Sequence, residues 1–170
     1  EPVEHYKAIL RGLANLSGTH RAGKLSPDFD KTFPFNREQA SAVFAIRTPE
    51  EKLVQRANKM FDFVARYPKL FPENVRTPEF REQFISDIPD VVAAEQRIRE
   101  VLYSNAEFIA FAHWNANIDN CWFLRDAKGE LQCGFMDWAN AGQISVAQSV
   151  SGAISGAEPF IWNEHLDELL

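Results

Sequence analysis

Several features that would quickly place a protein in a class are scarce in this 170-residue chain. Its two cysteines, Cys121 and Cys133, form no CxxC motif and lie outside any histidine-rich cluster, so they do not predict a zinc site. They flank an expected turn and could face each other across a hairpin, but nothing in the sequence indicates an oxidising compartment. We therefore expect two reduced core thiols rather than a disulfide.

Long apolar runs and basic clusters are missing as well. No segment approaches the roughly 20 apolar residues of a membrane span. The first residues, EPVEHYK, have neither the basic start nor the apolar stretch of a signal peptide. The net charge of −6 and the lack of a Lys/Arg run argue against nucleic-acid binding. These absences predict a cytoplasmic protein whose partner is neither a membrane nor a nucleic acid.

What is present is an ordinary globular composition. Hydrophobic residues make up 45% of the chain and charged residues 25%, a mixture typical of globular domains. A chain of this length can bury a sizeable core, and one domain over residues 1–170 is the expectation.

Apolar residues at helical spacing dominate the first part of the chain. Residues 1–25 predict a helix with Gly23 near its end. The stretch LSPDFDKTFPF predicts a loop, after which Asn36 could cap a short helix that runs through Ile46.

Three further helices are predicted before residue 104. TPEE at Thr48 combines a capping Thr, Pro at the first helical position and Glu three residues after the cap, and this helix should end before Pro68. TPEF at Thr77 opens the next helix, and Pro89 is expected to start a third that continues to about Tyr103. Their apolar residues are expected to pack in the core: Leu53, Val54, Ala57, Met60, Phe61, Val64, Ala65, Phe80, Phe84, Ile85, Val91, Val92, Ala94, Ile98, Val101 and Leu102.

The pattern changes after Asn105. The run FIAFA predicts a buried strand, and CWFLRDAKGELQCGFMDW predicts a β-hairpin that turns near Gly129. Helical segments are expected again at about 144–156 and 159–169. The expected fold class is therefore mainly α with a small β-hairpin, an α+β fold.

Other polar and small residues predict little chemistry. His5, His20 and His165 are isolated, each on a predicted helix or at its end, and are expected to be surface or satisfied residues. Gly152 and Gly156 form a GxxxG pair, which in this setting indicates close packing of a helix.

A polar cluster lies between two apolar runs in FIAFAHWNANIDNCWFL. Buried polar groups need partners, so the cluster is either a satisfied hydrogen-bond network or a site. Asn120 stands just before the first hairpin strand and Asp137 at the end of the second, so they should be neighbours at the open end of the hairpin. An amide oxygen and a carboxylate there could share Mg²⁺, which prefers oxygen ligands.

The order of residues around this hairpin follows a known pattern. The chain has His113-x-Asn115-x-x-x-x-Asn120, then the hairpin, then Met136-Asp137-Trp138. It resembles phosphotransferases of the aminoglycoside/choline kinase type, relatives of the protein kinases, which carry HxDxxxxN, a short hairpin and an Asp in an IDW-like strand end. The motif lies within residues 108–138, and the flanking helices extend the resemblance loosely to the whole chain.

The resemblance implies a fold and a reaction. Residues 1–170 would form the C-terminal lobe of a kinase-like fold. Its parts would be the first helix after the hinge (1–25), a helical acceptor-site region (36–104), the catalytic loop and metal-binding hairpin (108–138) and the C-terminal helices (144–170). The implied reaction is transfer of the γ-phosphoryl group of ATP to a hydroxyl group of a small molecule.

The resemblance also implies roles for single residues. Asn120 and Asp137 would hold Mg²⁺ on ATP or another nucleoside triphosphate, and His113 would brace the loop. Trp122 and Met136 would form the floor of the nucleotide pocket.

Two departures from the family pattern matter. Asn115 stands at the position of the catalytic Asp, and an amide does not accept a proton as a carboxylate does. Asp119, four residues on, could supply a displaced carboxylate or simply point to solvent. In addition, the sequence has no glycine-rich phosphate loop, no Walker motif and no strand-rich stretch with the ATP-binding Lys, so the N-terminal lobe is absent. We expect a fragment of a longer protein or a chain that has lost this lobe, with the missing lobe or a second copy as partner.

Three functions follow as alternatives. The chain could belong to an active phosphotransferase, or to a pseudokinase-type protein that binds a nucleotide or ligand with Asn115 in place of the catalytic Asp. It could also be a helical interaction module whose polar cluster is only a buried network. Magnesium-dependent nucleotide binding separates the first two from the third, and measured phosphoryl transfer separates the first from the second.

Overall fold

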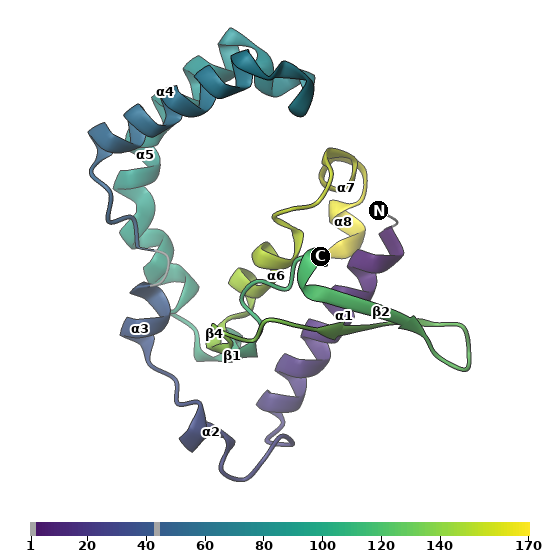
Figure 1. Cartoon of the computed structure of the whole chain (residues 1–170). Helices are drawn as coiled ribbons and strands as arrows, with labels where there is room; N and C mark the ends of the chain where they lie inside the picture. The colour runs from purple at the N-terminus through teal and green to yellow at the C-terminus, as the bar shows by residue number, and fades with distance from the viewer. Residues whose placement is uncertain (1–2, 43–44) are drawn as a thin grey trace. The chain divides into compact units, whose positions relative to one another are not determined.

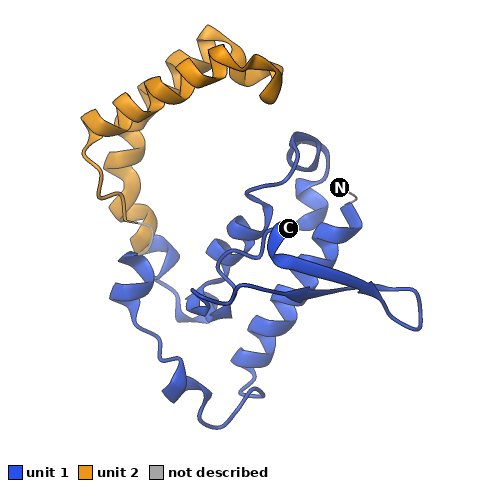
Figure 2. Ribbon diagram, in the orientation of Figure 1, with its two compact units in different colours: residues 1–42, 101–170 blue, residues 43–100 orange. Residues whose placement is uncertain are grey.

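The computed structural model of the chain describes residues 3–42 and 45–170. The described residues are mainly helical, and their strands form two antiparallel sheets of two strands each (Figure 1). This agrees with the α+β class expected from the sequence. The chain groups into two compact units (Figure 2): unit 1, residues 1–42 and 101–170, and unit 2, residues 43–100. The single kinase-like lobe stays a prediction.

Helix α1 (Val3–Arg21) is the central element of unit 1. Its apolar face, with Tyr6, Ile9 and Leu13, is buried. The helix ends earlier than the expected residue 25, at a Schellman motif. The N–H of Gly23 donates to the carbonyl of His20 and the N–H of Lys24 to the carbonyl of Thr19, and Gly23 has the positive φ of 65° that this motif needs.

Both small sheets pack against α1. Strand β1 (Ile109–Ala112) is buried throughout and pairs with β4 (Gly142–Ser145). The expected hairpin is confirmed as β2 (Cys121–Arg125) and β3 (Leu131–Phe135), with Gly129 at φ 81° in its turn. Strand β4 is a correction, because residues 144–145 were expected to be helical. Four residues that pair with a buried strand carry too little periodicity to predict.

The hairpin has one face toward the core and one toward solvent. Phe123 and Phe135 point inward and pack against the core cluster around Ile9. Trp122 and Leu124, on the other face of β2, are exposed. This alternation follows from the two-residue repeat of a strand.

The chain after β4 completes the core of unit 1. Helix α6 (Val146–Ile154) packs against α1, and α7 (Pro159–Glu164) and α8 (Leu166–Leu169) follow it. Gly152 has its Cα so close to the backbone of Trp114 that an added Cβ would lie 2.0 Å from that carbonyl oxygen, whereas nothing lies near Gly156. The close packing expected of the GxxxG pair is therefore found at its first glycine.

Short helices connect α1 to the rest of the chain and precede the sheets. A one-turn helix, α2 (Phe29–Thr32), lies within the stretch expected to be a loop. Asn36 caps α3 (Arg37–Ala42) by accepting the N–H of Gln39 at 2.9 Å, as expected. The described part of α3 ends at Ala42, residues 43–44 lie outside the described ranges, and Ile46 is not helical. Two 3₁₀ turns, Ala106–Phe108 (η3) and Ile118–Asn120 (η4), precede β1 and β2.

Unit 2 contains α4 (Glu50–Arg66), two 3₁₀ turns (η1, Pro68–Leu70; η2, Glu73–Arg76) and most of α5 (Pro78–Leu102). Thr77 caps α5 as expected, since its Oγ1 accepts the N–H of Phe80 at 3.2 Å. Thr48 does not cap α4; its hydroxyl accepts from Arg56 instead.

Two expectations for α5 were wrong. Pro89 lies inside one continuous helix rather than at the start of a new one. Proline removes a single N–H donor, and the rest of a 25-residue hydrogen-bond ladder remains. The apolar residues of α5 were expected in the core, but none of them is buried, and Val91 and Ile98 are half exposed. In α4 the expectation held for Ala57, Phe61 and Val64, and failed for Met60 and Ala65, which are exposed.

Candidate functional site

The ends of β1 and β3 meet at the polar cluster, around the peptide groups of Met136. The Nε2–H of His113, directly after β1, donates to the carbonyl of Met136 at 2.8 Å. The N–H of Met136 donates to the carbonyl of Asn120, also at 2.8 Å. Met136 is therefore held on both sides, and the next residue is Asp137. The predicted metal-binding residues, Asn120 and Asp137, are thereby brought to the same end of the hairpin.

His113 is buried, with 1% of its surface exposed. Its ring and that of Trp138 form a T-shaped pair, with the ring centroids 4.9 Å apart, and its carbonyl accepts the hydroxyl of Ser149 in α6 at 2.9 Å. The second ring nitrogen, Nδ1, is buried without a hydrogen-bond partner among the described residues. A buried imidazole in these contacts can position the loop and its Asp137 neighbour, but it does not reach solvent.

Three asparagines form a closed network beside it. The Nδ2 of Asn117 donates to Oδ1 of Asn115 at 3.1 Å, and the Nδ2 of Asn120 donates to the backbone carbonyl of Asn115 at 2.8 Å. Asn117 also caps η4 by accepting the N–H of Asn120 at 3.3 Å. Because Asn120 uses its amide nitrogen within this network, its side-chain oxygen is the atom left for a cation.

Asp137 has an unusual backbone. Its φ of +56° is the left-handed conformation, and no other non-glycine residue within 3–42 and 45–170 has a positive φ. Such a conformation costs on the order of 1–3 kcal/mol and is concentrated at functional sites. The Asp137 carboxylate is exposed, as is that of Asp119 in η4. The clamped Met136 peptide is the neighbouring contact that holds the strained residue in place.

The donor set fits a magnesium ion that is also bound by phosphate. Asn120 and Asp137 offer one amide oxygen and one carboxylate, both hard oxygen donors. The described part of the chain contains no group of three or more His, Cys, Asp or Glu side chains that could hold a metal ion. Any Mg²⁺ here would thus take its remaining ligands from phosphate oxygens and water, which is its usual habit.

Trp122 and Met136 lie on the outer face of the hairpin. Each is exposed by nearly half, so the open end of the hairpin carries an accessible apolar surface. Trp122 lies flat over Gly134 opposite it, and a Cβ at that glycine would come within 2.1 Å of the indole ring. Gly134 is therefore required for the indole to lie along the strand.

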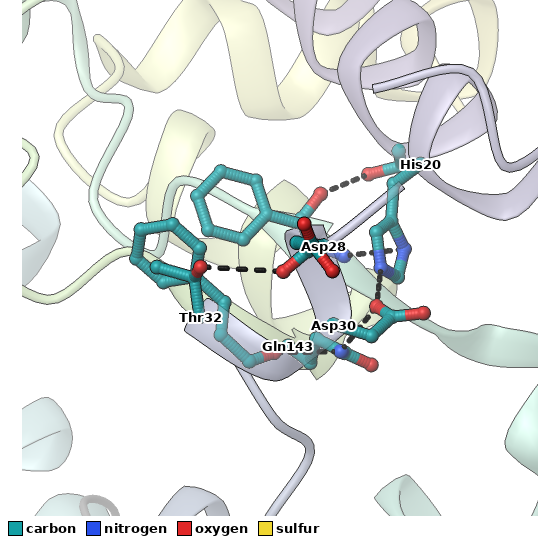
Figure 3. Close-up of polar contacts among 8 residues, drawn as sticks. His20, Asp28, Asp30, Thr32 and Gln143 are labelled. Carbon is teal, nitrogen blue, oxygen red and sulfur yellow. Dashed lines mark hydrogen bonds and ion pairs between the residues drawn. The ribbon is translucent and has the colours of Figure 1, made fainter. Parts of the chain in front are cut away.

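A second polar cluster, around His20, was not predicted from the sequence (Figure 3). The N–H of Phe111 in β1 donates to Nδ1 of His20 at 3.1 Å, so Nε2 carries the proton and donates to Asp30 at 2.9 Å. The side-chain amide of Gln143 in β4 donates to the same carboxylate oxygen and to the carbonyl of Phe33. The cluster ties α1, α2 and both strands of the first sheet together.

This cluster contains a His–Asp pair, as a catalytic dyad does, but its histidine has no free ring nitrogen. A general base needs a ring nitrogen that faces the proton it takes. Both nitrogens of His20 are engaged, one by a backbone N–H and one by Asp30. We conclude that His20 is a structural residue whose ring nitrogens both have partners. This is the second of the two expectations for it, a satisfied residue rather than a surface one. The sequence offers no signal for its partners, which lie 10 and 91 residues away.

The two cysteines are free thiols, as expected, and both are half-buried against the core cluster. The register pairs Cys121 with Phe135 and Cys133 with Phe123, so the thiols are diagonal rather than opposite. The neighbouring Cys121 thiol lowers the pKa of Cys133, and the Cys133 thiol together with burial raises the pKa of Cys121.

Comparison with known proteins adds no family to this geometry: no family model, no curated protein and no solved structure matches the chain. Across residues 3–42 and 45–170, no helix combines the length and apolar character needed to cross a bilayer.

Proposed function

We propose that this chain is part of an ATP-dependent phosphotransferase that transfers the γ-phosphoryl group to a hydroxyl group of a small molecule. The observation that carries the proposal is the clamp on Met136, which brings Asn120 and the strained Asp137 to one end of the hairpin. Two oxygen donors at this place, on a rigid support, are what a Mg²⁺-nucleotide site requires.

Each residue of the site has a separate role in this proposal. Asp137 and the Oδ1 of Asn120 hold Mg²⁺, and His113 positions them through the carbonyl of Met136. When bound, Mg²⁺ neutralises charge on the β- and γ-phosphates, which is the main electrostatic contribution to phosphoryl transfer. The exposed face of Trp122 and Met136 provides the apolar floor for a nucleotide base. The partner lobe would cover this same face, because large apolar surfaces are seldom left bare.

A nucleotide-binding protein without turnover is the second candidate, and Asn115 favours it. The Oδ1 of Asn115 is already engaged by Asn117, and an amide cannot take the proton of an acceptor hydroxyl. Positioning and charge neutralisation carry most of phosphoryl transfer, so turnover without this base would be slow rather than abolished. Asp119 is exposed and would be the substitute base.

Magnesium-dependent nucleotide binding tests the proposal. Isothermal titration of the chain with ATP should show binding in Mg²⁺ that is lost in EDTA. Asp137→Asn should remove the Mg²⁺-dependent part, because it deletes the charge while Asn still tolerates a positive φ. Asp167→Asn, an exposed aspartate in α8, is the matched control and should change nothing. Binding that is independent of Mg²⁺, or unchanged in Asp137→Asn, would refute the site.

Turnover separates the two candidates. Asn115→Asp should raise phosphate release from Mg²⁺-ATP on the order of tenfold or more, because general-base assistance is typically worth roughly 10²–10⁴-fold in rate. The new carboxylate can keep the contact with Asn117. Asn163→Asp is the matched control, since it makes the same substitution at an exposed asparagine of α7, away from the loop. Binding without phosphate release in either protein would favour the nucleotide-binding candidate.

A further inference from the structure

A polar cavity of about 370 Å³ lies between α1 and β3 in unit 1. Arg11 and Asn15 line it from the helix, and Glu130 and Cys133 line it from the strand and the residue before it. Its size is that of a pocket for a small molecule, which typically measures about 300–1,000 Å³. The cavity therefore gives a small reagent a path to the thiol of Cys133.

The two cysteines of the hairpin differ in access to this cavity. Cys121 is not among the residues that line it, and its thiol donates to the carbonyl of Asn117 at 3.2 Å. Cys133 lines the cavity, and its thiol has a long contact of 3.6 Å with the carbonyl of Gly134. A reagent that enters the cavity thus meets the Cys133 sulfur and not the Cys121 sulfur.

The two thiols also differ in how readily they lose a proton. The neighbouring Cys121 thiol lowers the pKa of Cys133, against the effect of burial, whereas the Cys133 thiol and burial raise the pKa of Cys121. The thiolate, and not the thiol, attacks a disulfide. Cys133 is therefore both the more accessible sulfur and the better nucleophile of the pair.

The register of the hairpin disfavours a bond between the two sulfurs. Cys121 pairs with Phe135 and Cys133 with Phe123, so the cysteines are diagonal neighbours. Diagonal residues of an antiparallel pair lie about 7–8 Å apart, whereas the Cα atoms of a disulfide are usually about 4.4–6.8 Å apart. An oxidised Cys133 is thus expected to keep an external partner instead of closing a bond to Cys121.

Two opposite charges line the cavity with no ion-pair partner. Within residues 3–42 and 45–170, neither the guanidinium of Arg11 nor the carboxylate of Glu130 forms a salt bridge, and the Nε of Arg11 donates only to the carbonyl of Lys7. A reagent with both a carboxylate and an ammonium group can meet each charge with its opposite. Small thiols built from amino acids, such as glutathione, carry both groups.

We propose that Cys133 is a thiolation site, at which the disulfide form of a small thiol built from amino acids exchanges with the Cys133 thiol. The Cys133 thiolate attacks one sulfur of the reagent, so that a new S–S bond forms as the S–S bond of the reagent breaks. Cys133 is oxidised, and the leaving half of the reagent is reduced to a thiol that takes up the proton Cys133 has lost.

This inference concerns the face of the hairpin that packs on α1. It does not depend on nucleotide binding or phosphoryl transfer at Asn120 and Asp137, so either proposal can fail without the other.

Intact mass spectrometry of the 170-residue chain after incubation with oxidised glutathione tests the site. One glutathione per chain is expected, and peptide mapping should place it on Cys133. Cys133→Ser should take up none, and Cys121→Ser should still take up one. An unmodified chain, equal modification of both cysteines, or loss of two hydrogens through an internal disulfide would each overturn the proposal.

A bulky side chain in the lining tests whether the cavity is the route. Asn15→Tyr narrows it and should slow modification of Cys133 at least about threefold, because thiol exchange depends on access. Ala14→Tyr is the matched control, since Ala14 is also exposed on α1 but does not line the cavity. In urea that unfolds the chain, the two variants should react at the same rate. Equal slowing of both variants in the folded state would overturn the proposal.

A comparison of two reagents tests the charge of the ligand. Arg11→Gln should slow the reaction with oxidised glutathione about two- to threefold, the scale of an exposed charge contact, and should leave the reaction with uncharged hydroxyethyl disulfide unchanged. Lys7→Gln removes the same charge from α1 outside the lining and should affect neither reagent. Equal slowing of both reagents by Arg11→Gln, or an equal effect of Lys7→Gln, would rule out recognition of a charged thiol and overturn the proposal.

Discussion

Units 1 and 2 use apolar helices in different ways. In unit 1, the apolar face of α1 is covered by the hairpin and by α6, and Tyr6, Ile9 and Leu13 are buried. In unit 2, α5 carries a comparable number of apolar residues, yet none is buried. The two helices have the same kind of sequence pattern. The difference teaches that helical periodicity identifies an apolar face, whereas burial of that face requires a second element placed against it.

The two units also differ in how deeply they bury polar groups. Unit 1 buries His113, Ser145, Gln148 and Ser149, and His113 and Ser149 are joined through the His113 carbonyl. In the described part of unit 2 no polar residue is fully buried, and contacts such as that between Arg81 of α5 and Asn58 of α4 are only partly buried. Unit 1 therefore has buried hydrogen bonds behind its candidate site, whereas unit 2 leaves a groove between two helices that contact mainly near their linked ends.

The largest expected effect contrasts a buried apolar residue of α1 with an exposed apolar residue of α5. Ile9→Ala should lower the free energy of unfolding by about 2–5 kcal/mol, because it opens a cavity around a side chain with no exposed surface. Val91→Ala should change it by less than about 0.5 kcal/mol, as expected of an exposed position. Urea unfolding followed by circular dichroism measures both. Similar losses at the two positions would mean that α5 is covered in solution.

Tight packing behind the polar cluster provides the next test. Gly152→Ala should lower the free energy of unfolding by about 1–3 kcal/mol, since its Cβ would meet a backbone carbonyl that cannot turn away. Gly156→Ala is the matched control, with open space around it, and should be neutral. Thermal unfolding of the two variants measures this difference. Equal melting temperatures would show that the loop after His113 can shift to accommodate the added methyl group.

A polar contact with a fully buried partner and one with a half-buried partner should differ in the same direction. His20→Ala leaves the N–H of Phe111 without its acceptor and should cost about 1–3 kcal/mol. Arg81→Ala in unit 2 removes contacts with Asn58 and Asp62 near the surface and should cost less than about 1 kcal/mol. Chemical denaturation compares them. A larger loss for Arg81→Ala would reverse the ranking of the two units.

The smallest expected effect is a gain. Asp137→Gly should raise the free energy of unfolding by about 1 kcal/mol, because glycine adopts a positive φ without strain. Asp137→Ala keeps the strain and should give no gain. If the proposed Mg²⁺ site is correct, the stabilised glycine variant also loses Mg²⁺-dependent ATP binding, which is the usual exchange of stability for function. Equal stability of the two variants would argue against strain at Asp137.

Much of the local structure follows from the sequence. The hairpin turn at Gly129, the caps at Asn36 and Thr77 and the buried strand before His113 all depend on neighbours within a few residues. The proximity of Asn120 and Asp137 also follows, because a hairpin fixes the pairing of its own ends. The assignment of these residues to magnesium and ATP stays a prediction.

Other features depend on partners far along the chain and were missed. Strand β4 forms only because β1, about 30 residues earlier in sequence order, offers a free edge. His20 looks isolated in the sequence, and its role comes from Phe111 and Asp30. Pro89 looks like a helix start, but the ladder on both sides continues through it.

The sequence by itself determined most of the long helices, the hairpin and the polar residues at its open end, since these follow from periodicity, caps and turns that act locally. The tertiary structure decided which apolar faces are covered, how Met136 is clamped between His113 and Asn120, and that the α4–α5 face remains an open groove. The physical reason is that burial and the satisfaction of polar groups are properties of contacts between distant segments, and a local pattern can specify a surface without specifying what meets it.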